Sequence, residues 1–150
     1  MHPPLPNISV VLPVYKPELH LLQEALESIK RQNYPHLELI ISIDGGIPDP
    51  HWEYQLVQWS GISKAKIVYH HGISGIFANL NHALSYVSGD FVQLFCQDDR
   101  MYPEFLKKQV EVFENNDRVA MVFSSFDVID EHGVMVNESV QFTYRPDQDR

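Results

Sequence analysis

The stretch Phe91-Val92-Gln93-Leu94-Phe95-Cys96-Gln97-Asp98-Asp99 joins an apolar run to a polar, acidic end. Residues 91–95 are typical of a short buried strand, which delivers the two aspartates at its carboxyl end. The same order recurs three times earlier in the chain. There, apolar runs at 8–14, 37–43 and 66–69 end in Tyr15-Lys16, Asp44-Gly45-Gly46 and His70-His71-Gly72.

Helical spacing separates these predicted strands. Between Pro17 and Gln32, apolar side chains recur at three- and four-residue steps. Similar patterns predict helices over 52–60 and 76–87 and a further helix that begins near Pro103. Alternating strands and helices predict an α/β fold with a Rossmann-like, open, mostly parallel sheet and helices on both faces.

The last part of the sequence predicts a different arrangement. We expect a fifth strand over 119–123 and then a hairpin, with strands at 126–129 and 134–136 and a turn at 130–133. Because 150 residues is the usual size of one domain, we expect residues 1–150 to form a single domain.

The composition excludes several classes of protein. The 20 acidic and 11 basic residues give a net charge of −9, which argues against holding nucleic acid or anionic lipid by bulk charge. One cysteine, Cys96, excludes a disulfide scaffold and a cysteine-based zinc site. No apolar run is long enough to cross a bilayer and no secretory signal opens the sequence, so we expect a cytoplasmic protein.

Ligands of open α/β sheets bind outside the carboxyl ends of the strands, where the polar residues above converge. Adjacent carboxylates repel each other unless a cation relieves the repulsion, so Asp98 and Asp99 are candidate ligands for Mg²⁺ or Mn²⁺. In an extended chain one could hold the metal while the other meets a sugar hydroxyl. The alternative is a solvated turn before the next helix, and spacing alone favours that alternative.

Two further features of this edge have open interpretations. Asp44 could accept an N–H from a base such as uracil, although Asp-Gly is also a common turn. His70-His71 could contact a phosphate or substrate, or could form an ordinary loop. The sequence lacks a Walker motif and a dinucleotide fingerprint, so a nucleoside diphosphate here would need a divalent cation.

Five segments, in this order, resemble the N-terminal, nucleotide-sugar-binding portion of a family 2 glycosyltransferase with the GT-A fold. They are residues 8–15, residues 25–35, Ile43-Asp44-Gly45-Gly46, Gly72-Ile73-Ser74-Gly75 with Asn81-His82-Ala83-Leu84, and Gln97-Asp98-Asp99.

The resemblance implies an enzyme that transfers a sugar from a nucleoside diphosphate, UDP- or dTDP-linked, to an acceptor hydroxyl with inversion. Mn²⁺ or Mg²⁺ would be held by Asp98 and Asp99, Asp44 would contact the base, and Asp98 would also lie near the ribose and diphosphate. The implied nucleotide-binding residues are Pro13, Val14, Tyr15, Asp44, Gly45, His71, Gly75, Asn81, Gln97 and Asp98.

The resemblance also implies a role in cell-surface polysaccharide biosynthesis. The acceptor would be a carbohydrate, a lipid-linked molecule or a protein, and the full-length protein would be cytoplasmic or peripheral at the inner membrane face. Members of this family place the general base in a C-terminal half, so we expect it beyond Arg150 and expect this chain alone to lack full transfer activity. A truncated sheet would also favour self-association.

Three positions depart from the family pattern. Lys16 stands where asparagine is usual, Ile43 replaces the first of two aspartates, and Cys96 occupies a position that is often acidic. The first two put base contacts in question, and the third makes the metal ligand set leaner. A non-catalytic nucleotide-sugar-binding or protein-binding module with the same fold remains the alternative function.

Overall fold

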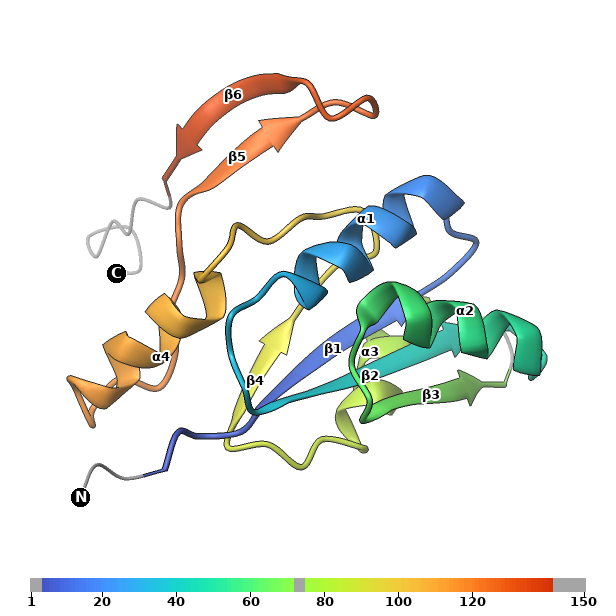
Figure 1. The fold of residues 1–150 in the computed structure, drawn as a ribbon, viewed down its shortest axis with the longest axis horizontal. Helices are drawn as coiled ribbons and strands as arrows, with labels where there is room; N and C mark the ends of the chain where they lie inside the picture. The colour runs from blue at the N-terminus through green and yellow to red at the C-terminus, as the bar shows by residue number, and fades with distance from the viewer. Residues whose placement is uncertain (1–3, 72–74, 142–150) are drawn as a thin grey trace, which may run out of the picture. The chain divides into compact units, whose positions relative to one another are not determined.

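The computed structural model describes residues 4–71 and 75–141, and the chain divides into two compact units, Met1–Val110 and Glu111–Arg150. The elements follow one another in strict alternation until the last two strands (Figure 1). They are β1 (Ile8–Val14), α1 (Leu19–Lys30), β2 (Leu37–Asp44), α2 (Pro50–Ser60), β3 (Ala65–His70), α3 (Ile76–Leu84), β4 (Phe91–Leu94), α4 (Phe105–Glu114), β5 (Phe126–Ile129) and β6 (Met135–Val140).

The first unit contains a four-stranded parallel sheet in the order β3-β2-β1-β4. Ile8 at the start of β1 pairs with Leu37 on β2 and with Phe91 on β4, so the three strands begin level with one another. Their carboxyl ends consequently open at one edge of the sheet. The predicted open, mostly parallel α/β sheet is confirmed.

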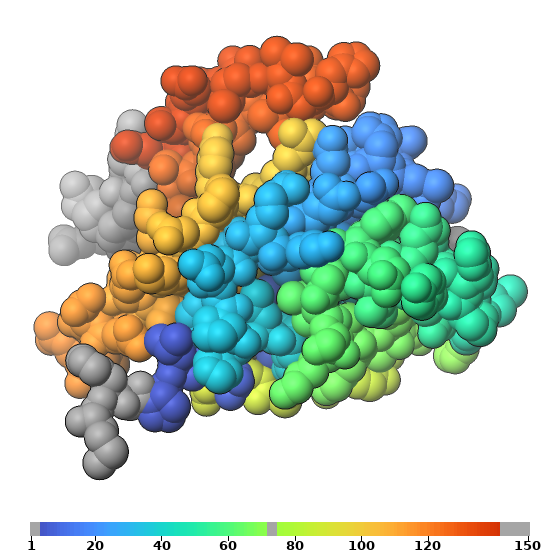
Figure 2. Space-filling view, viewed as in Figure 1, coloured from blue at the N-terminus to red at the C-terminus, as the bar shows by residue number. Residues whose placement is uncertain are grey.

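Helices cover both faces of this sheet, as predicted. Alternate side chains of β1 point to opposite faces, so that Val10 and Leu12 join the larger core with α1 and α2, whereas Val11 joins a smaller core with α3. In Figure 1, α1 and α2 lie in front of the sheet and α3 behind it. The space-filling view shows α1 and α2 covering most of the sheet from the front (Figure 2).

Helix α2 has clear start and stop signals. The Asp49 carboxylate accepts the backbone N–H groups of His51 at 2.9 Å and Trp52 at 3.3 Å, and Gly61 ends the helix with a φ of 60°. Trp52 and Trp59 meet edge to face with their ring centres 5.7 Å apart. This pair packs against the larger core on the front of the sheet.

A partly buried carboxylate joins the strands at their amino ends, opposite the pocket. Glu38 on β2 accepts hydrogen bonds from the Ser9 hydroxyl on β1 and from the backbone N–H and hydroxyl of Ser88, and lies 3.7 Å from Lys66 on β3. Burial alone would raise the pKa of Glu38, but the hydrogen bonds and the lysine lower it to about 2. Glu38 therefore stays ionised while it joins three strands and the segment before β4.

The loop before β4 also needs a glycine for steric reasons. A Cβ on Gly89 would lie 2.6 Å from the Ser9 hydroxyl oxygen, 2.8 Å from the Ser9 nitrogen and 2.9 Å from the Asn7 carbonyl oxygen. Backbone atoms of a central strand cannot move away cheaply. Only glycine therefore allows the chain to pass this close to β1.

The second unit contains the predicted hairpin of β5 and β6, which is confirmed. At its turn, the Asp130 carboxylate accepts the backbone N–H groups of His132 at 2.9 Å and Val134 at 2.8 Å. The predicted strand over 119–123 is wrong, because these residues form no ladder within the described chain. The N–H of Val119 closes a turn onto the Asn116 carbonyl instead, and an apolar run becomes a strand only when a neighbour supplies the ladder.

No helix in residues 4–71 and 75–141 combines the length and the apolar character needed to cross a bilayer. Strand β4 lies at an edge of the sheet with Val92 and Leu94 exposed. Self-association through such an edge stays a prediction, as does the single domain over 1–150.

Candidate functional site

A pocket of about 420 Å³ opens at the carboxyl ends of the parallel strands, a volume within the usual range for small-molecule sites. It brings together most of the predicted nucleotide-binding residues and adds three that were not predicted. The lining consists of the predicted Pro13, Val14, Tyr15, Asp44, Gly75, Gln97 and Asp98, with Ile76, Asn79 and Cys96 in addition.

Gln97 holds the ends of β1 and β4 together at one wall of this pocket. Its side-chain oxygen accepts the backbone N–H of Tyr15 at 2.9 Å, and its side-chain nitrogen donates to the Tyr15 carbonyl oxygen at 3.2 Å. Both ends of the Gln97 amide are thus engaged with one residue. The bonds fix the Tyr15 backbone where the strand ladder has already stopped.

The Tyr15 ring is 40% exposed at the mouth of the pocket. Lys16 follows it with a φ of 41°, a left-handed conformation in which most residues other than glycine and asparagine are strained. The Lys16 ammonium lies 5.2 Å from the centre of the Tyr15 ring. The departure from asparagine at position 16 therefore falls on a backbone conformation that asparagine adopts more readily.

Asp44 forms the opposite wall at the end of β2 and is only 6% exposed. One of its carboxylate oxygens accepts the backbone N–H of Gly75 at 3.2 Å, and the other lies 3.7 Å from the His70 Nδ1. Gly75 has a φ of 81°, which favours glycine, and it directly precedes α3. Asp44 thus joins β2, the end of β3 and the start of α3 around a carboxylate that lines the pocket.

The acidic pair follows β4. Asp98 lines the pocket, and Asp99 is the next residue. Desolvation by the surrounding chain and the charge of Asp98 raise the pKa of Asp99, while a hydrogen bond with Cys96 lowers it. A divalent cation would relieve this repulsion, and carboxylate oxygens are the ligands that Mg²⁺ and Mn²⁺ prefer.

The acidic pair fits a lightly ligated cation. Within the described residues, no three His, Cys, Asp or Glu side chains are grouped closely enough to form a complete metal cage. Mg²⁺ is usually held by one or two carboxylates, with water and phosphate oxygens completing its coordination. Two adjacent aspartates beside a pocket match that pattern.

Cys96 lies beside the acidic pair in the pocket lining. Desolvation and the charges of Asp99 and Asp98 raise the pKa of its thiol to about 11. Without a bound cation the thiol therefore stays protonated at neutral pH.

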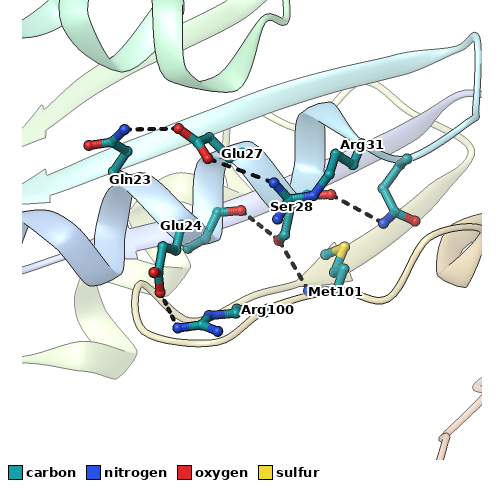
Figure 3. A network of polar contacts seen from close by, with 9 residues as sticks. Gln23, Glu24, Glu27, Ser28, Arg31, Arg100 and Met101 are labelled. Atoms are coloured by element: carbon teal, nitrogen blue, oxygen red, sulfur yellow. Dashed lines mark hydrogen bonds and ion pairs between the residues drawn. The ribbon is translucent and has the colours of Figure 1, made fainter. Parts of the chain in front are cut away.

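The segment that follows the acidic pair is fastened to α1 (Figure 3). Arg100 pairs with Glu24, and the backbone N–H of Met101 donates to the Ser28 hydroxyl at 3.1 Å. One turn later, the Gln32 side chain donates to the Tyr102 carbonyl at 2.8 Å and accepts the Leu106 N–H at 3.1 Å. Helix α1 thereby fixes where the chain leaves the acidic pair.

Three predicted residues lie outside the pocket lining. Gly45, His71 and Asn81 are all exposed, and residues 72–74 of the predicted glycine segment lie outside the described residues. The assignment of these three residues to the nucleotide stays a prediction.

Asn79 lines the pocket but was not predicted, and the predicted Asn81 follows it by two residues. Residues two apart on a helix lie on different faces. The signal that could have identified Asn79 is its place four residues before the buried Ala83, on the face that α3 turns to the sheet.

The family model for glycosyl transferase family 2 matches residues 9–149 of the chain. A putative glycosyltransferase of Bacillus subtilis, EpsE, is 30% identical over 129 residues, which are 86% of this chain and 46% of that protein. The chain thus spans less than half the length of this relative. A glycosyltransferase of Methanocaldococcus jannaschii is 27% identical over 135 residues, 89% of this chain and 46% of its own length.

Solved structures share the fold. TarS 1-349 from S. aureus in complex with UDP-GlcNAc is 20% identical with a TM-score of 0.63, over 82% of this chain and 40% of that chain. The mannosyltransferase PcManGT from Pyrobaculum calidifontis in complex with GDP-Man and Mn²⁺ is 24% identical with a TM-score of 0.57, over 66% of this chain and 29% of that chain.

Proposed function

Because the chain belongs to glycosyl transferase family 2, we propose that its pocket binds the nucleoside diphosphate part of a sugar donor, UDP- or dTDP-linked. The observation that carries this proposal is the meeting of Tyr15, Asp44 and Asp98 around one pocket at the carboxyl ends of the strands. The aromatic ring and the hydrogen-bond acceptor suit a base and a ribose. The carboxylate beside a second carboxylate suits a metal-bound diphosphate.

In this arrangement the Asp44 carboxylate accepts an N–H from the base. The Gly75 N–H holds this carboxylate in place. The exposed Tyr15 ring supplies an apolar surface at the mouth of the pocket. Asp98 lies across the pocket, near the ribose and diphosphate.

Asp98 and Asp99 would hold Mn²⁺ or Mg²⁺. When bound, such a cation neutralises the diphosphate and stabilises it as a leaving group. A chain with a net charge of −9 has few basic side chains of its own to neutralise a diphosphate. The complex of PcManGT with GDP-Man and Mn²⁺ supports a divalent cation for this fold.

We propose that the carboxylates of the described hairpin unit do not supply the general base for an inverting transfer. Such a base must lie within hydrogen-bond reach of the acceptor hydroxyl. The late carboxylates Asp127 and Asp130 are instead engaged within the hairpin unit, where Asp127 accepts the Ser139 N–H and Asp130 closes the turn. For the whole protein we propose a carbohydrate, a lipid-linked molecule or a protein as the acceptor, and a location in the cytoplasm or at the inner membrane face.

Titration calorimetry of the chain with UDP, dTDP and GDP, each with and without Mn²⁺, tests the proposal. We expect UDP or dTDP to bind in the presence of Mn²⁺, and Asp99→Asn to abolish the metal-dependent part. Asp117→Asn makes the same chemical change at an exposed acid outside the pocket lining and should bind as the unchanged chain does. A folded sample that gives no heat with any nucleotide in either condition would refute the proposal.

A further inference from the structure

The pocket contains one buried polar side chain to which the proposed function gives no task. Asn79 lies on α3, lines the pocket and is only 1% exposed. Burying a primary amide is costly unless its donors and acceptor find partners. The partners of Asn79 therefore indicate what the residue does.

The amide of Asn79 bonds to two strands. Its nitrogen donates to the Ser42 carbonyl at 2.9 Å and to the Val14 carbonyl at 3.4 Å, and its oxygen accepts the Ser42 hydroxyl at 2.6 Å. Carbonyl oxygens only accept hydrogen bonds, so the amide has one orientation that satisfies all three contacts. No buried side-chain polar atom in the described chain is left without a partner.

The hydrogen bonds of Asn79 lie where the backbone ladder between β1 and β2 ends. The last paired residues are Val14 on β1 and Ile43 on β2. Val14 directly precedes Tyr15, and Ser42 stands two residues before Asp44. The Asn79 side chain therefore bonds to both strands at the last rungs of their ladder, next to the residues that line the pocket.

A histidine on α3 also contacts Ser42, one of the partners of Asn79. The His82 Nδ1 lies 3.0 Å from the Ser42 hydroxyl oxygen. Because that hydroxyl gives its single proton to Asn79, His82 must carry a proton on Nδ1 to complete the contact. The His82 ring in turn meets the ring of His70, which lies beside Asp44, with centres 4.9 Å apart.

We propose that Asn79 is a positioning residue that holds the ends of β1 and β2 at the separation that the nucleotide requires. The proposal rests on the proposed function of the pocket. Asn79 is not proposed to touch any reacting group. It acts through Val14 and Ser42, and thereby places the Tyr15 and Asp44 walls relative to each other.

The test compares Asn79→Ala and Asn79→Asp with Glu38→Gln. Asn79→Asp keeps the side-chain shape but turns a carboxylate oxygen toward two carbonyl oxygens. Glu38→Gln weakens the partly buried polar contacts at the amino ends of the strands and serves as a control for lost stability. Each chain is examined by calorimetry with UDP and Mn²⁺ and by amide hydrogen exchange.

We expect Asn79→Ala to weaken nucleotide binding about tenfold, the effect of losing one or two buried hydrogen bonds, and Asn79→Asp to weaken it at least as much. Exchange should accelerate at the Tyr15 and Gly45 amides but not at Asp90 and Phe91, which bond to Asn7 at the amino ends of the strands. Glu38→Gln should give the reverse pattern of exchange and unchanged affinity.

Unchanged affinity and unchanged exchange at Tyr15 and Gly45 in a folded Asn79→Ala chain would overturn the proposal. An affinity loss of the same size in Glu38→Gln would also overturn it, because general destabilisation would then explain the effect. If the unchanged chain binds no nucleotide, the proposed function fails, and the exchange pattern alone decides whether Asn79 positions the strand ends.

Discussion

The Ser28 hydroxyl on α1 accepts the backbone N–H of Met101 at 3.1 Å, and Met101 follows Asp99 by two residues. The same hydroxyl donates to the Ala25 carbonyl at 2.7 Å, so its orientation is fixed. A buried side chain of one helix thus determines where the acidic segment leaves the pocket. Arg100 and Glu24 add an ion pair outside this bond, with both side chains about one third exposed or more.

Ser28→Ala is expected to lower the free energy of unfolding by about 1–2 kcal/mol, because it leaves the buried Met101 N–H without its acceptor. Mn²⁺ affinity should fall with it, since the acidic segment loses its fixed exit. Urea denaturation and a metal titration measure the two effects. Arg100→Ala, which removes only the exposed pair, should change stability by less than about 1 kcal/mol. A larger loss in Arg100→Ala than in Ser28→Ala would contradict this ranking.

Glu38→Gln is expected to make stability less dependent on pH in the acid range. The pKa of Glu38 is lowered to about 2 in the folded chain from its ordinary value of 4.5. Its ionised form therefore contributes stability above about pH 4.5, up to about 3 kcal/mol, and this contribution is lost as the pH falls from 4.5 toward 2. Urea denaturation at pH 7 and pH 3 should show a smaller difference for the variant, and an equal difference would exclude Glu38 as the cause.

Gly89→Ala is expected to cost about 1–3 kcal/mol through overpacking, because the new methyl group would meet backbone atoms of Asn7 and Ser9. Gly46→Ala is the matched control. Its Cβ would also approach a neighbour at 2.6 Å, but that neighbour is a side-chain methyl of Ile43. Thermal unfolding should therefore rank Gly89→Ala as the more damaging change, and the opposite order would show that β1 yields more easily than its side chains.

Lys16→Asn is expected to raise the free energy of unfolding by about 0.5 kcal/mol. The φ of 41° at this position strains a lysine more than an asparagine, although the contact with the Tyr15 ring is lost. Lys64→Asn makes the same change at a residue without positive φ and should not stabilise the chain. Equal effects of the two substitutions in chemical denaturation would rule out backbone strain as the reason.

The sequence predicted the elements of the first unit well because each one satisfies its own local pattern. The run from Ile8 to Val14 is apolar on both faces, and the structure buries it on both faces between α1 and α3. The run over 119–123 has the same local character, but a strand also needs a neighbour for its ladder. That requirement depends on tertiary structure and cannot be seen in five residues.

Some residues of the candidate site could likewise be predicted from the sequence, and others could not. Asp44, Gln97 and Asp98 could be predicted because they follow strands, and parallel strands end at one edge. Asn79 comes from a helix that approaches the pocket from behind the sheet. Its role depends on which residues of α3 face the ends of β1 and β2, and this cannot be read from the sequence alone.

Both tryptophans of the chain, Trp52 and Trp59, belong to the edge-to-face pair on α2, and neither lines the pocket. Tryptophan emission from this protein is therefore a local reporter of whether α2 is seated on the sheet. Tryptophan emission therefore suits the unfolding measurements described above and should monitor them through a single spectroscopic signal. A nucleotide titration needs a different optical probe, and the exposed ring of Tyr15 is the natural position at which to introduce one.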